Sequence, residues 1–292
     1  MKTLINRHIK LFLKNPSNII LSFLSSLVIL SLYFLFIRDF TIKAVEDYGF
    51  ISSYTSLFVD RLMTSGLLIV IGATSTLSII FILIKDCCNN TIKDFLTTPL
   101  SKLKIIYSYF FAALIISTII TFLVYIGIEL FFHIKYHDIA SSEMILKSIS
   151  IIFFSNIIAT LILIIIALGI KTITSFSTFE TLYGVVIGFF TGVYIPIGYY
   201  PNIIRNIFFY FPLCQTTSIL RNIETTSITK KILALYPKEQ HSVLYETFGI
   251  HLTFQEKSVT ITYQIKMLLV ALLLLNIILL WIIYKKRKEG KI

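Results

Sequence analysis

Residues 85–104 read KDCCNNTIKDFLTTPLSKLK, a polar stretch that separates two of the longest apolar runs in the chain. The apolar run 73–84 ends before it, and the run 105–132 begins after it. The whole chain is 56% hydrophobic and only 14% charged. A polar stretch of this length is therefore not expected to lie in the hydrophobic environment that the apolar runs require. The alternation predicts helices that cross a membrane and a connection between them that does not.

The composition of the whole chain supports this interpretation. Its mean hydropathy is +0.86, and its charged fraction of 14% is well below the roughly one quarter that is usual for soluble domains. A helix needs about 20 apolar residues to cross roughly 30 Å of hydrocarbon. The sequence predicts an all-α integral membrane fold with six transmembrane helices, because no alternating pattern of a β-barrel competes. The six apolar blocks lie near 19–37, 62–84, 105–132, 149–170, 179–200 and 265–284.

The distribution of Lys and Arg predicts the orientation. With the N-terminus in the cytosol, the inside segments hold 14 Lys and Arg against 3 Asp and Glu, whereas the outside segments hold 12 against 10. Because cytosolic loops of membrane proteins are enriched in basic residues, both termini are expected in the cytosol. The net charge of +11 is then a topology signal, and no nucleic-acid partner is expected. A residue composition rich in Ile, Lys, Phe and Asn suggests a multi-pass protein of a bacterial cell membrane.

The N-terminal segment 1–16 precedes the first apolar block. Within it, apolar residues alternate with Arg7, His8, Lys10 and Lys14, and Pro16 follows. This pattern is typical of an amphipathic helix that lies at the membrane surface. A simple cytosolic extension of the first span is the alternative.

The region after the fifth apolar block is interrupted by prolines and glycines. Gly184, Gly188 and Gly192 recur every four residues, so we expect them on one helix face, where small residues let another helix approach. A straight helix cannot continue through the prolines that follow. The sequence predicts that 196–262 forms one or two short re-entrant helices and then, over 224–262, a small external subdomain.

The connections and the polar residues inside the spans give further expectations. The first outer loop, 38–61, contains Asp60 and Arg61 and is expected to be a solvated connector. Charged residues deep in the spans are almost missing, which argues against an ion-coupled transporter. The polar groups expected near the middle of the membrane are hydroxyls and amides, which serve either helix packing or a substrate path. They are Ser25, Thr74, Ser75, Ser78, Thr118, Asn156 and Asn276.

The sequence contains no pattern typical of a catalytic or nucleotide-binding site. The Walker A pattern is absent, as are G-x-S-x-G, H-E-x-x-H and any C-x-x-C pair. His133 and His137 are four residues apart, but no Glu follows the first of them, and we expect no metal site there. The chain is therefore not expected to be an enzyme or to bind a cofactor itself.

Two motifs resemble those of ABC-2-type transporter permeases. The first, NTIKDFLTTPLSK at 90–102, is similar to the segment between spans two and three of that family. Asn90 replaces the usual Gly, and Lys93 replaces the usual Glu, so that Asp94 is the acid that could contact a partner. The residues that match in position or kind are Thr91, Leu96, Thr98, Pro99, Ser101 and Lys102.

The second motif, GVYIPIGYYPNIIRNIFFYFPL at 192–213, resembles the end of the family's fifth span. The matching residues of this re-entrant motif are Gly192, Pro196, Pro201, Pro212 and the later Arg221. The order of the two motifs, the predicted spans and the cytosolic ends all resemble the family. The resemblance therefore covers nearly the whole chain. It implies a single transmembrane domain over residues 1–292.

The resemblance also implies a function. The chain would be the membrane subunit of an exporter, paired with an identical or related second permease and with cytosolic ATPase subunits that bind ATP and Mg²⁺. Segment 85–104 would couple to the ATPase, and segment 1–16 would support the same contact. The implied coupling residues are Lys85, Asp86, Thr91, Lys93, Asp94, Thr98, Pro99 and Lys102. The expected cargo is amphipathic or hydrophobic: a drug, a lipid-like toxin or haemolysin, or a peptide. An ion-coupled secondary transporter and a polytopic membrane enzyme are the alternatives.

Overall fold

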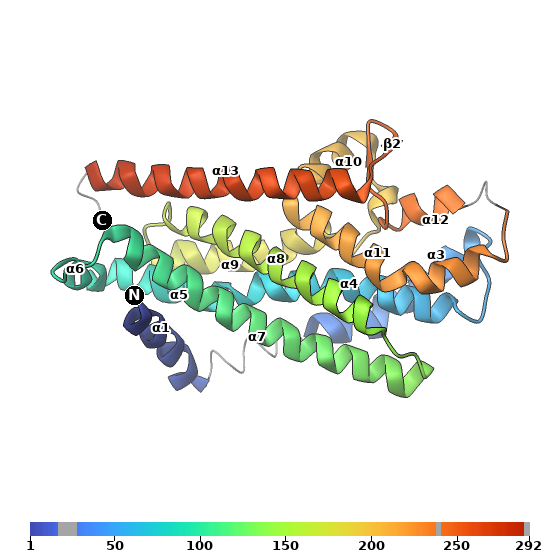
Figure 1. The fold of residues 1–292 in the computed structure, drawn as a ribbon, viewed down its shortest axis with the longest axis horizontal. Helices are drawn as coiled ribbons and strands as arrows, with labels where there is room; N and C mark the ends of the chain where they lie inside the picture. Colours follow the sequence, from blue (N-terminus) through green and yellow to red (C-terminus); the bar gives the residue numbers. More distant parts are fainter. Residues whose placement is uncertain (17–27, 238–240, 289–292) are drawn as a thin grey trace.

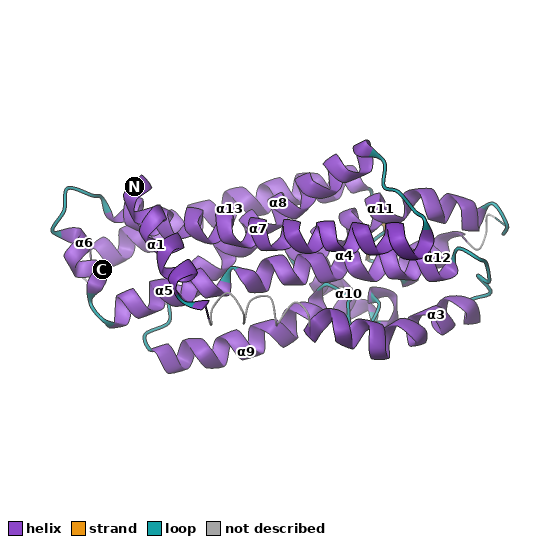
Figure 2. Ribbon diagram, turned by 90° about the horizontal axis from the view of Figure 1, so that it is seen from below, coloured by secondary structure: helices purple, strands orange, loops and turns teal. Residues whose placement is uncertain are grey.

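The structure, a computed structural model, describes residues 1–16, 28–237 and 241–288. It is an elongated bundle whose long helices run along one axis (Figure 1). Helices α1 and α6 lie at one end together with the N-terminus and the last turns of α13, and α3 and α12 lie at the opposite end (Figures 1 and 2). We call these the α6 end and the α12 end.

The described elements are almost all helical. A two-stranded antiparallel hairpin, in which Thr253 pairs with Ser258, is the exception. The helices of the first half are α1 (Lys2–Lys14), the π-helical η1 (Tyr33–Ile37), α3 (Arg38–Asp47), α4 (Thr55–Ser75), α5 (Leu77–Cys88), α6 (Thr91–Leu96) and α7 (Lys102–Tyr136). The second half contains α8 (Ser142–Ala167), α9 (Ile173–Phe190), the 3₁₀ turn η2 (Ile197–Tyr199), α10 (Asn202–Phe209), α11 (Pro212–Leu233), α12 (His241–Thr247), β1 (Thr253–Phe254), β2 (Lys257–Ser258) and α13 (Ile261–Lys288).

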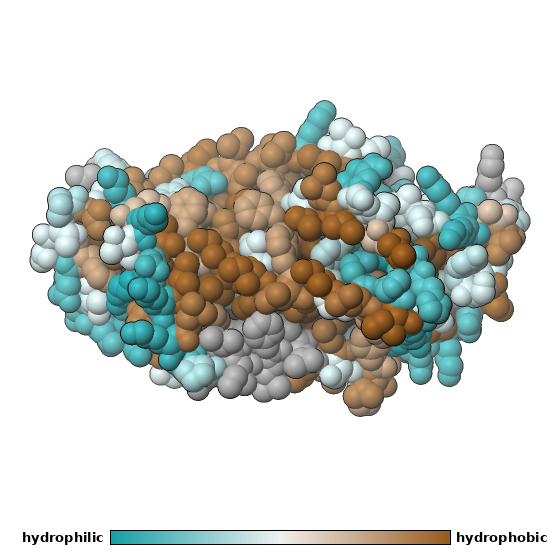
Figure 3. All heavy atoms as spheres, turned by 60° about the horizontal axis from the view of Figure 1, so that its bottom comes forward, coloured by the Kyte–Doolittle hydropathy of each residue, from teal (hydrophilic) through white to brown (hydrophobic). Residues whose placement is uncertain are grey.

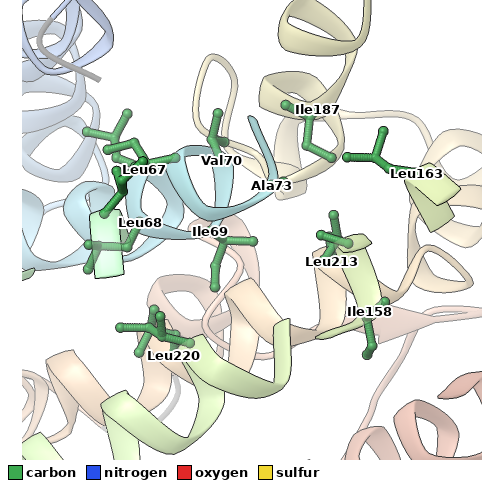
Figure 4. Packing of buried hydrophobic residues seen from close by; sticks show 14 of the residues in the cluster. Leu67, Leu68, Ile69, Val70, Ala73, Ile158, Leu163, Ile187, Leu213 and Leu220 are labelled. Carbon is green, nitrogen blue, oxygen red and sulfur yellow. The ribbon is translucent and has the colours of Figure 1, made fainter. Parts of the chain in front are cut away.

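Helix α4 forms the centre of the bundle. Nearly all of its side chains are buried, and it packs against α7, α8, α9 and α11. Because lipid chains are as apolar as Leu, close van der Waals packing rather than escape from water holds helices together in a membrane. Figure 4 shows this contact, in which Leu67, Leu68, Ile69, Val70 and Ala73 of α4 face Ile158 and Leu163 of α8, Ile187 of α9, and Leu213 and Leu220 of α11.

Five of the described helical segments are long and apolar enough to cross a membrane: 55–88, 102–136, 142–167, 173–190 and 261–286. The segment 55–88 is 83% buried over its most apolar window, whereas 173–190 and 261–286 are 22% and 17% buried there. The apolar faces of α9 and α13 are thus left open for lipid or another chain. Figure 3 shows hydrophobic side chains across the middle of the visible face and hydrophilic ones toward both ends.

These segments agree with five of the six predicted spans. The fifth begins and ends earlier than predicted, because α9 stops at Phe190 and the chain turns before Pro196. The first predicted span, 19–37, includes residues 17–27, which lie outside the described residues. Its remaining part is helical and passes through η1.

The prediction that 38–61 is a solvated connector is wrong for its last residues, although Asp39, Lys43 and Asp47 are exposed. Helix α3 and the start of α4 occupy most of this range, and Asp60 and Arg61 are 0% and 1% exposed. Charged side chains can be buried when they pair with opposite charges. The partners of these two are distant in sequence, so the local pattern gave no sign of them.

The region after α9 is only partly as predicted. The short η2 and α10 confirm the predicted interruption of the helix. Pro212, however, opens a long helix, since proline at the first helical position has no hydrogen bond to lose. Helix α11 packs against α4, α8 and α13 through Leu233, so the first ten residues of the predicted external subdomain over 224–262 are part of the helix bundle.

The glycines of α9 do not act together as predicted. Gly192 lies beyond the end of the helix, in a turn with φ +64°, where a side chain would be strained. Gly188 accommodates the ring of Tyr194, and a Cβ at Gly184 would meet nothing within 4 Å. The close helix approach instead occurs at Gly72 of α4, where a Cβ would lie 2.1 Å from Oδ1 of Asn156 on α8.

The contact at Gly72 gives a stability prediction. Gly72→Ala is expected to lower the free energy of unfolding by about 1–3 kcal/mol, because the buried Asn156 would have to move. The measurement is the thermal unfolding midpoint of the purified protein in detergent. Gly127→Ala is the matched control, because nothing lies within 4 Å of its added Cβ. Equal midpoints for the two variants would contradict the packing described.

Candidate functional sites

Segment 85–104 forms a helical elbow at the α6 end. Lys85 and Asp86 lie in the last turn of α5, a turn at Asn89 and Asn90 follows, and α7 begins at Lys102 after the short α6. Asn90 has a left-handed backbone with φ 60°, a conformation that Asn tolerates better than most residues. The elbow thus reverses the chain between two long helices.

The second half of the elbow is a tight turn closed by hydroxyls. The Thr98 hydroxyl donates to the carbonyl of Phe95 at 2.5 Å, and the N–H of Leu100 donates to the carbonyl of Thr98 at 2.7 Å. Pro99 lies between these bonds, where its fixed φ suits a turn. Ser101 then caps α7 by accepting the N–H of Lys104. Thr98 and Pro99 therefore end α6 and set the direction in which α7 begins.

The elbow residues differ in exposure. Thr91 and Lys102 are half-buried, and Asp86 is buried. The residues available for contact with another protein are on the outer surface of the elbow: Lys85, Lys93, Asp94, Thr98 and Pro99.

Asp86 is bound within the chain. It accepts two hydrogen bonds from Arg7 of α1, at 2.8 and 3.2 Å, and one from the Tyr109 hydroxyl at 2.6 Å. A two-bond pair between a guanidinium and a carboxylate fixes orientation as well as distance. The Arg7 guanidinium also lies 4.9 Å from the centre of the Phe95 ring of α6. Arg7 therefore joins α1 to α5 and α6.

His8 anchors α1 to α7. It is fully buried and stacks on Tyr109 with 3.8 Å between ring centroids. The Ser108 hydroxyl donates to the carbonyl of Ile105, so Nε2 of His8 donates to Ser108 at 2.9 Å. Nδ1 is then free to accept a hydrogen bond from Arg7. Burial, with the nearby charge of Arg7, lowers the pKa of His8 to about 4, so the ring is neutral at pH 7.

Sequence reasoning placed an amphipathic helix here but missed the role of Arg7 and His8. The signal was available, because His8 lies between Leu4 and Phe12 on the buried stripe of α1. A polar residue on the apolar face of a helix needs a hydrogen-bond partner.

A second polar cluster lies toward the α12 end, around Arg61 of α4. The guanidinium contacts Glu129 of α7 at 3.1 Å, Asp138 after α7 at 2.8 Å and Glu224 of α11 at 2.6 Å. Tyr125 and Ser148 donate to Glu224, and Arg61 also lies over the Phe132 ring. One cation thereby holds three carboxylates. We call Arg61, Glu129, Asp138 and Glu224 the Arg61 cluster.

The neighbouring Asp60 has its own set of partners. Tyr33 of η1 and Arg38 of α3 bind it at 2.7 and 2.8 Å, and Lys135 and Tyr136 of α7 complete the set. Two consecutive residues of α4 thus tie together most of the elements at this end. Sequence reasoning missed both.

The re-entrant motif is assembled around Arg221. This residue is fully buried, and it donates to the carbonyls of Gly192 at 2.8 Å, Phe248 at 3.3 Å and Leu62 at 3.3 Å. The structure thus brings Arg221 and Gly192 together. Pro196 and Pro201 immediately precede η2 and α10, and Pro212 is the first residue of α11.

The predicted substrate-path residues do not form one group. Asn156 of α8 and Thr121 of α7 both approach Gly72, and Asn156 Nδ2 and Thr118 Oγ1 have no hydrogen-bond partner among the described residues. Asn276 lies on α13 and accepts from Tyr107 at 3.4 Å. The remaining members occupy other positions: Thr74 and Ser78 are half-buried, Ser75 is buried, and Ser25 lies outside the described residues.

Comparison with known proteins gives one family. The sequence model described as ABC-2 type transporter matches residues 1–225 of the chain. The match includes the elbow, the re-entrant motif and the residues of the Arg61 cluster. No curated protein and no solved structure gives a significant match.

The environment of His8 predicts a pH-dependent docking of α1. An undocked His8 would have a pKa near 6.5, against about 4 when docked. Above pH 6.5 the ring is neutral in both states, and docking does not depend on its titration. As the pH falls from 6.5 to 4, only the undocked ring gains a proton, so docking weakens by about 1.4 kcal/mol per unit.

Spin labels on the exposed Lys2 and Lys93 would report this docking as a distance distribution that broadens between pH 6.5 and 4. His8→Gln, which cannot gain a proton but can still bind Ser108, is the control. It should remove the broadening in this range. Equal broadening in the wild type and in His8→Gln would show that another group is responsible.

Proposed function

The chain belongs to the ABC-2 type transporter family, and on this premise we propose that it is the permease subunit of an exporter driven by a separate ATPase. It is an all-α, multi-pass integral membrane protein and a transport component rather than an enzyme. Members of this family work with ABC ATPase subunits. The observation that carries the proposal is the elbow, which presents polar side chains at the tip of two long apolar helices.

The elbow has the properties expected of a coupling element. Its outer surface is exposed, while its inner side is held by Arg7 over Phe95 and by the bond between Arg7 and Asp86. A short helix that is fixed on one side and exposed on the other can transmit a force from a bound protein without unfolding. The exposed Lys85 and Lys93 favour an acidic contact on the ATPase, and Asp94 provides an acid for a basic one.

Helix α7 offers a route for the movement. It begins at the elbow and has 35 residues, so it is about 50 Å long. Near its far end, Glu129 binds Arg61 and Tyr136 binds Asp60. A tilt of α7 caused at the elbow would therefore act directly on the contacts at the α12 end. Such a two-state rearrangement, biased by nucleotide, is how we propose that ATP hydrolysis opens the path.

The remaining parts of the proposal follow from the sequence. ATP and Mg²⁺ bind to the ATPase subunits, and a second permease, identical or related, pairs with this chain. The open apolar faces of α9 and α13 are available for that pairing. We place the elbow and both termini in the cytosol of a bacterial cell, and we take the whole chain as one transmembrane domain.

The cargo that we propose is amphipathic or hydrophobic: a drug, a lipid-like toxin or haemolysin, or a peptide. Two buried polar atoms support this, because Asn156 Nδ2 and Thr118 Oγ1 have no partner among the described residues. A substrate with few polar groups could use such atoms if the helices separate. Movement outward from the cytosol is the direction that fits this cargo.

The coupling proposal predicts the effect of changing the turn. Thr98→Ala combined with Pro99→Ala is expected to lower the amount of ATPase that co-purifies by roughly tenfold, since coupling energies of 1–3 kcal/mol are typical. Both side chains are exposed and close only the local turn, so the unfolding midpoint should change little. The measurement is co-elution with the ATPase of a neighbouring gene, together with its vanadate-sensitive hydrolysis.

Lys147→Ala is the control, because Lys147 is exposed near the start of α8, toward the α12 end. It should leave co-elution unchanged. Transport driven by an ion gradient and insensitive to vanadate would contradict the proposal and favour a secondary transporter.

A further inference from the structure

A crevice of about 420 Å³ opens between the last turns of α7 and the first turns of α8. This volume is within the range of small-molecule sites, roughly 300–1,000 Å³. Its walls are apolar side chains from both helices and the loop between them: Ile126, Leu130, Ile139, Ile145 and Ile149. The walls are therefore suited to a hydrocarbon chain.

The crevice also has a charged side. Glu129 and Asp138 line it, with side chains 17% and 25% exposed, and His133 lies beside them in the lining. Behind them Arg61 is 1% exposed and is shared with the buried Glu224. Three carboxylates therefore meet one guanidinium, which gives the Arg61 cluster a formal charge of −2 when all three are ionised.

The nearby cations do not remove this surplus. Lys135 binds Asp60, and Lys147 binds Glu143. Arg221 is one turn before Glu224 on α11 and has backbone carbonyls as partners, so it offsets one charge at longer range. Its guanidinium lies next to Gly66 and Gly192. The carboxylates that face the crevice remain in excess.

We propose that this crevice binds the ammonium group of an amphiphile, with its apolar chain along α7 and α8. A surplus of negative charge in a mostly apolar site is unfavourable, and a bound cation would relieve it. Ionised carboxylates act only as acceptors and have more acceptor positions than Arg61 occupies. An anionic head would be repelled, and an uncharged chain would leave the surplus in place.

The inference does not depend on coupling to an ATPase, because it needs only binding. The proposed orientation enters at one point: with the elbow in the cytosol, the crevice faces the outer leaflet. The ammonium group could come from a lipid headgroup or from a free amphiphilic amine. Both sources share the chemistry that the crevice recognises.

Native mass spectrometry of the purified chain in a non-ionic maltoside detergent can test the proposal. The probes are dodecylamine and dodecanol, which differ in charge at equal chain length, and phosphatidylethanolamine and phosphatidylglycerol with equal acyl chains. We expect dodecylamine to bind at least about tenfold more tightly than dodecanol, as for a charged group that meets an excess of opposite charge. Equal binding of the two would overturn the proposal.

Substitutions locate the site. Glu129→Gln should reduce dodecylamine binding to the level of dodecanol, whereas Glu143→Gln, an exposed carboxylate of α8, should not. Ile149→Trp should fill the crevice and block binding without changing a charge, which tests the site even if Glu129→Gln destabilises the Arg61 cluster. Full binding by an Ile149→Trp protein with a wild-type unfolding midpoint would overturn the proposal.

The lipid probes identify the source. Binding of phosphatidylethanolamine but not phosphatidylglycerol, lost on Glu129→Gln, would assign the crevice to a lipid headgroup. Binding of dodecylamine alone, with the same dependence on Glu129, would assign it to a free amphiphilic amine. Preference for phosphatidylglycerol over both amines would contradict the charge argument.

Discussion

The contact of one guanidinium with three carboxylates, at Arg61, is the constraint on which the α12 end of the bundle depends. It joins α4 to α7, to the connection after α7 and to α11, and the adjacent Asp60 adds η1 and α3. Packing of apolar side chains alone would not fix how these helices are rotated, because lipid is an equally apolar alternative. Directional ion pairs, by contrast, can be satisfied in only one arrangement. Loss of Arg61 would leave three carboxylates without their shared cation.

The α6 end is organised by the same principle on a smaller scale. Arg7 and Asp86 fix α1 against α5, and the neutral His8 adds a bond to α7 without adding charge. Helix α7 connects the two ends, since it carries Ser108 and Tyr109 near the elbow and Glu129 and Tyr136 far from it. A helix fixed at both ends by specific polar contacts moves as a unit. This arrangement suits a protein in which force at one end has to produce a rearrangement at the other.

The sequence predicted features that depend on local chemistry. The amphipathic α1 and the break between α9 and α10 each follow from residue types within a few positions. It failed for features that depend on distant partners. Arg61 and Glu224 are separated by 163 positions, and Arg61 and Glu129 by 68, so no local pattern shows that these charges are paired and buried. The last ten residues of α11 were predicted to begin an external segment because their sequence is polar. The hydroxyl of Thr225 binds the carbonyl of Arg221 in the preceding turn, which makes such a sequence compatible with burial.

The two buried arginines near the α12 end, Arg61 and Arg221, have opposite charge imbalances around them. Helix α11 links them, because it carries both Arg221 and Glu224, which binds Arg61. Arg221 has backbone carbonyls as partners, so its charge is hydrogen-bonded but not neutralised. Glu224 lies three residues later, on the same face of the helix, and belongs to a cluster with too many carboxylates for its one cation. The unneutralised positive charge of Arg221 and the excess negative charge around Glu224 are one helical turn apart. They attract each other in a medium of low dielectric constant, which lowers the free-energy cost of burying both. The compensation is incomplete on the side of Glu129 and Asp138, where α7 and α8 leave an opening, and that is where a mobile cation from the membrane can complete it.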